Sequence, residues 1–132
     1  MGPIYDDSET WARRRAHYED TLNRPGSFAL IAWDDDTPVG YATLVIEPNR
    51  SPSWPQPDRY ADLDSLAVAP EARGQGIGEA LVARVQAEIE QEGIRELRLF
   101  AVAGNARALA FYERLGFAPY VVALRREQGP GA

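Results

Sequence analysis

The chain has 132 residues, a length that predicts one domain over residues 1–132, with residues 1–7 and 127–132 as flexible ends. Its hydrophobic fraction of 45% and charged fraction of 26% are typical of globular proteins and argue against intrinsic disorder. The net charge of −6 argues against nonspecific binding to nucleic acid or to an anionic membrane, and favours a cationic partner. All 14 basic residues are Arg and Cys is absent, which excludes lysine Schiff bases, disulfides and cysteine nucleophiles. With a single His, we expect no metal site.

Helical and strand patterns alternate along the first half of the chain. Large side chains at helical spacing predict a helix over Ser8–Leu22. Two strands that are apolar on both faces follow at Phe28–Trp33 and Val39–Ile46, joined by an acidic hairpin turn. The segment Asn49–Asp58 carries three prolines, which cannot join a sheet ladder, so we expect a surface loop there.

The second half predicts a βαβ unit followed by one more helix and strand. The strand Tyr60–Val68, the helix Gly76–Glu92 and the strand Ile94–Val102 form this unit, with parallel strands and a right-handed crossover. A further helix opens at Asn105, and a last strand is expected over Phe117–Arg125. This order predicts an α/β fold, a mixed sheet with helices packed on both faces.

A glycine-rich stretch lies between the third predicted strand and the helix that follows it. Gly74, Gly76 and Gly78 let the backbone pass close to a ligand, and the first turn of the helix adds unpaired N–H donors with a partial positive charge. Arg73 adds a full charge and a planar fork for phosphate oxygens. We interpret the stretch as a diphosphate-binding loop, with a glycine-rich turn without a ligand as the alternative. Its spacing fits no dinucleotide fingerprint, and a Walker A loop needs a lysine.

Two motifs in this chain match one known family. Arg73, Gly76 and Gly78 match Arg/Gln-x-x-Gly-x-Gly/Ala, and the segment from Asn105 to Phe117 matches Asn-x-x-Ala-x-x-Phe-Tyr-x-x-x-Gly-Phe. Together they resemble the GNAT N-acetyltransferase superfamily. The resemblance implies a GNAT-like enzyme that transfers the acetyl group of acetyl-CoA directly to a primary amine of a small molecule or peptide, in a ternary complex and without a metal. A non-catalytic acyl-CoA-binding or regulatory domain is the alternative.

The resemblance also implies which residues hold acetyl-CoA. In such proteins the strand before the glycine loop splays from its parallel neighbour, and the pantetheine arm pairs with its backbone as another strand would. The diphosphate lies at the glycine loop, and the Asn and Tyr of the second motif contact the pantetheine and the sulfur. The expected cofactor-binding residues are therefore Leu66, Ala67, Val68, Arg73, Gly74, Gln75, Gly76, Ile77, Gly78, Glu79, Asn105 and Tyr112.

Catalysis needs a base and a proton donor. An amine with a pKa of about 10 is mostly protonated at pH 7, so a base or a water chain must remove a proton. Asp62 and Asp64 are two apart on one strand and are the candidate catalytic bases. The resemblance implies that Tyr112 donates a proton or hydrogen bond to the departing thiolate, with a core aromatic as the alternative. Asn105 is also a good helix N-cap.

The start of the chain departs from the family pattern. Family members usually begin with a strand and a helix before the helix expected at Ser8–Leu22, so we expect this sequence either to lack the usual first strand or to be trimmed at its start. An open sheet edge beside Phe28–Trp33 favours association, and we expect a homodimer unless residues 1–7 cover that edge. No targeting signal is found, which predicts a cytoplasmic location. The sequence leaves the acceptor amine open.

Overall fold

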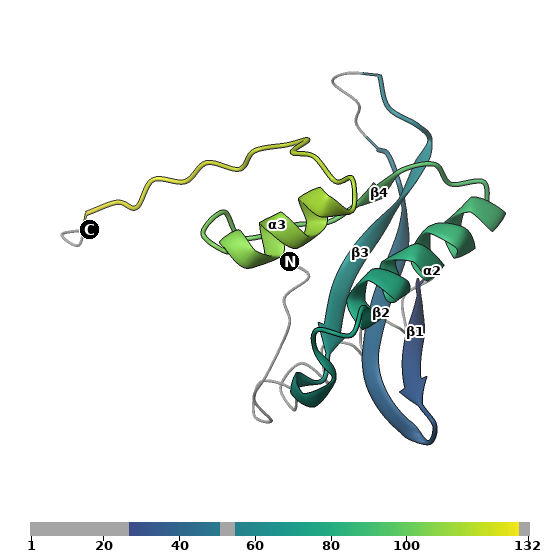
Figure 1. Ribbon diagram of the computed structural model, residues 1–132. Coiled ribbons are helices and arrows are strands. Elements are labelled where there is room, and N and C mark those ends of the chain that lie inside the picture. The colour runs from purple at the N-terminus through teal and green to yellow at the C-terminus, as the bar shows by residue number, and fades with distance from the viewer. Residues whose placement is uncertain (1–26, 51–54, 130–132) are drawn as a thin grey trace.

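The computed structural model describes residues 27–50 and 55–129, and the elements that they form are labelled in Figure 1. The expected helix Ser8–Leu22 and the end 1–7 lie outside the described residues. In chain order the elements are β1 (Ser27–Asp34), β2 (Thr37–Pro48), β3 (Arg59–Val68), the 3-10 turn η1 (Pro70–Ala72), α2 (Ile77–Gln91), β4 (Leu97–Arg98) and α3 (Ala106–Arg114).

The four strands form one mixed sheet in the order β1-β2-β3-β4. The pairs β1–β2 and β2–β3 are antiparallel, and β3–β4 is parallel, so the predicted α/β fold and the parallel βαβ unit are confirmed. The hairpin between β1 and β2 turns through two residues, Asp35 and Asp36. Asp35 has a φ of 53°, the left-handed conformation that Asp tolerates in tight hairpins.

Helix α2 packs across β1, β2 and β3 (Figure 1). Its buried face consists of Leu81, Val82, Val85 and Ile89, at the spacing of an amphipathic helix. Gly40 on β2 lets the helix come close, because a Cβ there would lie 3.2 Å from Ile77 and from Leu81. Helix α3 adds Tyr112 to the same core, so both described helices pack against one core.

The sheet opens between β3 and β4. Their pairing is limited to Ala61 with Leu97 and Asp62 with Arg98. Directly after this point β3 has a bulge opposite β2, with Asp64 as the extra residue. A bulge bends and twists its strand, which explains why β4 diverges from β3 at this point. The predicted strand Ile94–Val102 is therefore wrong in length, because only Leu97–Arg98 is paired.

The last predicted strand, Phe117–Arg125, is wrong. This segment runs away from the sheet as an extended chain (Figure 1), and Val122 and Leu124 are 71% and 91% exposed. Its alternating apolar residues favour a strand, but a strand without a paired neighbour is not stable by itself. The expected burial of β1 on both faces is also wrong, because Ile31 and Trp33 are exposed while the other face of β1 packs on the core.

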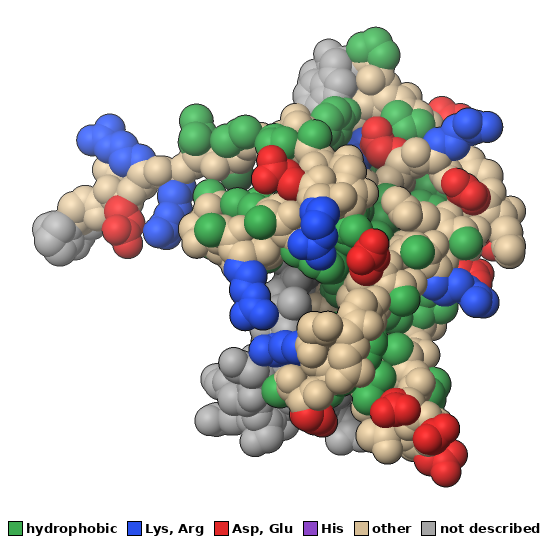
Figure 2. Space-filling model, in the orientation of Figure 1, with side chains coloured by type: hydrophobic (Ala, Val, Ile, Leu, Met, Phe, Trp, Pro, Cys, Tyr) green, Lys and Arg blue, Asp and Glu red, His purple; other side chains and the backbone are tan. Residues whose placement is uncertain are grey.

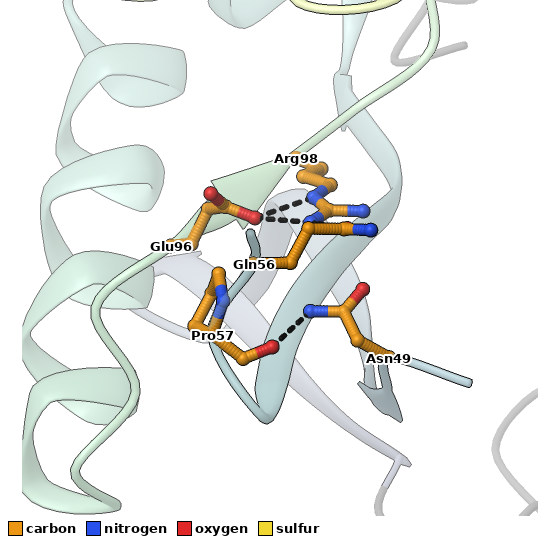
Figure 3. Close-up of polar contacts among 5 residues, drawn as sticks. All are labelled: Asn49, Gln56, Pro57, Glu96 and Arg98. Atoms are coloured by element: carbon orange, nitrogen blue, oxygen red, sulfur yellow. Dashed lines mark hydrogen bonds and ion pairs between the residues drawn. The ribbon is translucent and has the colours of Figure 1, made fainter. Parts of the chain in front are cut away.

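Arg98 connects β4 to the predicted proline loop, of which residues 51–54 are not described. Its guanidinium pairs with Glu96 and donates to Gln56 Oε1 at 2.9 Å, while the Asn49 side chain donates to the carbonyl of Pro57 (Figure 3). The guanidinium also lies 3.8 Å from the centre of the Tyr60 ring, a favourable cation–π distance. These contacts fix the loop against the end of the sheet at which β3 and β4 are paired.

Candidate functional site

The glycine loop has the backbone that its sequence predicts. Gly74 and Gly76 have φ values of 78° and 80°, in the left-handed region that favours glycine. A Cβ at either position would meet no atom within 4 Å. The two glycines are therefore required by the turn itself, and the space beside them is open to a ligand.

The start of α2 presents unpaired backbone donors. Its first helical hydrogen bond runs from the Ala80 amide to the Gly76 carbonyl at 3.0 Å. The amides of Ile77, Gly78 and Glu79 precede it and have no acceptor within the helix, and the cap residue Gly76 provides no side-chain acceptor for them. Together with the helix dipole, these donors form a site suited to an anion.

A cavity of about 500 Å³ opens beside this loop. Its walls come from the end of β3, the glycine loop, the first turn of α2 and helix α3. The lining residues are Leu66, Val68, Ala72, Arg73, Gly74, Gly76, Ile77, Gly78, Glu79, Asn105, Arg107, Ala108, Ala110, Phe111 and Arg114. In Figure 2 the cavity is the hollow between α3 and the glycine loop, with Arg side chains around it.

Two contacts hold the walls of the cavity together. A Cβ at Gly78 would lie 3.2 Å from Cζ of Phe111, so glycine at this position allows α3 to pack against the start of α2. On the other side, Arg73 Nε donates to the Val68 carbonyl at 3.4 Å, linking the loop to the end of β3. The two sequence motifs therefore meet in space, each supplying one wall.

The edge of β3 toward β4 has no strand partner beyond Asp62 among the described residues. Leu66, Ala67 and Val68 lie on this part of β3, and all three are buried. Leu66 and Val68 line the cavity, and Ala67 does not. An extended ligand that lies along this edge would thus reach the glycine loop at the C-terminal end of β3.

Asn105 caps α3, as expected. Its side-chain oxygen accepts a hydrogen bond from the Ala108 amide at 3.1 Å, and Asn105 also lines the cavity. Its cofactor-binding role stays a prediction, since capping alone accounts for an Asn at this position.

Tyr112 lies in the core and does not line the cavity. It is 3% exposed, and its ring contacts Phe111 and Phe117 edge to face at 5.2 and 5.6 Å between centroids. Burial raises the pKa of Tyr112 to about 12, because the phenolate is disfavoured away from water. The phenol is therefore protonated throughout the neutral range, as a proton donor must be.

The two candidate bases lie on β3 outside the cavity lining. Asp62 is opposite Val45 on β2 and beside Arg98 on β4, and Asp64 is the extra residue of the bulge. Both are half-buried. Their proposed role in proton removal stays a prediction.

The predicted cofactor residues are brought together almost completely. The exceptions are Ala67, Gln75 and Tyr112, which do not line the cavity. Sequence reasoning missed Arg107 and Arg114. Their seven-residue spacing, which puts both on one face of α3, was the signal that could have found them.

Beyond this cavity, the described residues form a second hollow, but neither a metal site nor a membrane-spanning helix. A hollow of about 790 Å³ beyond the C-terminal end of α2 contains none of the predicted site residues. The described residues include no group of three or more His, Asp or Glu arranged to hold a metal ion. Among the described helices, none combines the length and the apolarity needed to cross a membrane.

Comparison with known proteins agrees with this geometry. The acetyltransferase (GNAT) family matches residues 1–117. The chain belongs to this family. The predicted resemblance and the GNAT fold are thereby confirmed, and the glycine loop with the facing helix α3 lies within the matched part.

Three similar proteins illustrate the family. The mycothiol acetyltransferase of Geodermatophilus obscurus is 32% identical over 98 residues, 74% of this chain and 30% of the relative. The ribosomal protein bS18-alanine N-acetyltransferase of Escherichia coli is 44% identical over 57 residues, 43% of this chain and 38% of the relative. The structure of aminoglycoside N-acetyltransferase AAC(6′)-Iy in complex with CoA has a TM-score of 0.71 at 23% identity, covering 92% of this chain and 93% of that one.

The matched part spans about a third of the length of these curated relatives, 30% and 38%. At 23% identity, the structural likeness concerns the fold.

The raised pKa of Tyr112 gives a testable pH dependence. Unfolded tyrosine ionises near pH 10, whereas the folded protein keeps this proton until about pH 12. Between these values the unfolded state binds fewer protons, so stability present below pH 10 is lost as the pH rises. We expect this loss, up to about 1 kcal/mol per pH unit, to disappear in Tyr112→Phe when urea unfolding is followed across this range.

The control for this experiment is Tyr120→Phe, which removes a phenol that is 51% exposed. It should keep the pH dependence of the wild type. The same pH dependence in Tyr112→Phe as in the wild type would contradict the burial of an ionisable phenol at this position.

Proposed function

We propose that this chain is an acetyl-CoA-dependent N-acetyltransferase that acetylates a primary amine of a small molecule or peptide. The observation that carries the proposal is the cavity at which the glycine loop, the unpaired edge of β3 and helix α3 meet. Family membership supports it, and so do the names of the three similar proteins described above, each of which is an acetyltransferase.

The residues present fit CoA at both ends of this cavity. The unpaired amides of Ile77, Gly78 and Glu79, with Arg73, suit a diphosphate. The backbone of Leu66–Val68 suits the amide-containing pantetheine arm, because an extended chain can pair with a free strand edge. The cavity volume of about 500 Å³ lies in the range of small-molecule sites.

Bound acetyl-CoA supplies an electrophilic thioester carbonyl carbon. In the proposed transfer the amine nitrogen bonds to that carbon, the carbon–sulfur bond breaks, and the protein moves two protons. The acceptor loses two protons as it passes from ammonium to amide: Asp62 or Asp64 accepts one, directly or through water, and solvent takes the other. Tyr112 donates a proton to the thiolate and regains it from solvent. Burial raises the pKa of Tyr112 to about 12, so the phenol keeps its proton at pH 7 and has an O–H group to offer to the sulfur. Its ring contacts that of Phe111, which lines the cavity.

The acceptor is proposed as a cationic amine. The chain has a net charge of −6, and two carboxylates lie on β3 beyond the cavity. This charge attracts a protonated amine and would also orient it. The names of the relatives, which include a small-molecule and a ribosomal-protein acetyltransferase, leave both acceptor sizes open.

One observation favours the alternative of a non-catalytic acyl-CoA-binding domain. None of Asp62, Asp64 and Tyr112 lines the cavity. Such a domain would bind CoA through the glycine loop and release no thiol with any amine.

Turnover separates the two functions. We expect CoA thiol release from acetyl-CoA with at least one member of a panel of cationic amines. Tyr112→Phe should lower kcat by about 10- to 10³-fold, the range for an acid–base group, with little change in CoA affinity. An unchanged kcat in Tyr112→Phe would remove Tyr112 from the mechanism. Binding of CoA without turnover of any amine would favour the non-catalytic domain.

If calorimetry detects no CoA binding at millimolar ligand, both functions fail.

We also propose that the protein is a homodimer and works in the cytoplasm. Support for the dimer is that β1 is the outer strand of the described sheet and carries Ile31 and Trp33, 53% and 59% exposed. Large apolar side chains on an outer strand favour association. Light scattering should give twice the mass of one chain, falling toward one mass in Ile31→Lys. A single mass at every concentration tested would contradict the dimer.

A further inference from the structure

The cavity beside the glycine loop has a charge opposite to that of the whole chain. Among the described residues, those that line it and carry a charge are Arg73, Arg107, Arg114 and Glu79, three cations and one anion in a protein of net charge −6. Three of the 14 basic residues of the chain are thus gathered at one cavity. Figure 2 shows arginine side chains around the hollow. This local excess of positive charge favours a ligand with several negative charges.

The arginines belong to two separate walls. Arg73 is part of the glycine loop and donates to the carbonyl of Val68. Arg107 and Arg114 are seven residues apart on α3, on one face of the helix, and Phe111 lies between them. The α3 arginines therefore face the cavity from the side opposite the loop donors.

The position of Arg107 is unfavourable for the helix itself. It lies in the first turn of α3, where the dipole disfavours a cation, and that turn contains no acidic residue. Across the described residues, no carboxylate forms an ion pair with Arg107 or Arg114. Arg107 is thus a cation at a position that the helix dipole disfavours, and no carboxylate among the described residues compensates for it. Such a conflict with local preference is typical of functional sites, and here it favours a ligand.

The loop donors suit a diphosphate, as proposed above. The proposed cofactor carries a third phosphate, a monoester on the 3′ position of its ribose, which the loop amides leave without a partner. We propose that Arg107 and Arg114 bind this 3′-phosphate, so that the protein distinguishes CoA from dephospho-CoA. This inference rests on the proposed function, because it concerns the same cavity. A guanidinium fork matches phosphate oxygens, and both arginines are exposed enough to reach a ligand at the mouth of the cavity.

The test measures binding of CoA and of dephospho-CoA by calorimetry at low salt. We expect the wild-type chain to bind CoA about 10-fold more tightly, as for charge-assisted hydrogen bonds to one group. Arg107→Gln and Arg114→Gln should each bring the ratio of the two dissociation constants toward one, with little effect on dephospho-CoA. Added salt should lower the ratio in the wild type, because contacts between exposed charges are screened.

Arg84→Gln is the matched control. Arg84 lies on α2, its side chain is 67% exposed, and it pairs with Glu88 rather than lining the cavity. The wild-type ratio should persist in this variant.

Three results have distinct meanings. Equal affinity of the wild type for CoA and dephospho-CoA overturns the 3′-phosphate site and leaves the proposed function intact. Equal losses for both ligands in the α3 variants would assign Arg107 and Arg114 to the diphosphate and would also overturn it. Absence of binding by either ligand contradicts the proposed function together with this inference.

Discussion

The unpaired amides at the start of α2 are the constraint on which the rest of the site depends. A helix cannot satisfy its own first donors, and the left-handed turn at Gly74 and Gly76 brings the chain into α2 without covering them. Gly78 then keeps the first helical turn narrow enough for Phe111 to pack against it. Each glycine of the motif thus has its own physical reason, two in backbone conformation and one in packing.

The second requirement is an interrupted sheet. The bulge at Asp64 bends β3 just after its last pair with β4, and the free edge that results leads to the glycine loop. Helix α3 follows the divergent β4 segment and closes the far side of the opening. The glycine loop and the open edge of β3 therefore meet at one cavity. Among the described residues, this cavity is lined by three arginines and one glutamate, in a chain that is acidic as a whole.

Local features of the site could be predicted from the sequence. Glycine spacing, the Asn105 cap and the periodicity of α2 are properties of neighbouring residues, and the structure agrees with them. The end of β4 and the fate of the segment 117–125 depend on which distant strand supplies hydrogen-bond partners, and periodicity carries no information on that. Tyr112 and Phe111 show a subtler limit. Adjacent residues on a helix point about 100° apart, so a motif match does not tell which aromatic faces the cavity.

The most direct measurement is a titration of the ¹⁵N-labelled chain with CoA, followed by NMR at the individual backbone amides. If the start of α2 holds the diphosphate, the amide protons of Ile77, Gly78 and Glu79 will show the largest shifts and move downfield as they form charged hydrogen bonds. Saturable CoA binding with these three amides unmoved, and the main shifts elsewhere in the chain, would contradict the account.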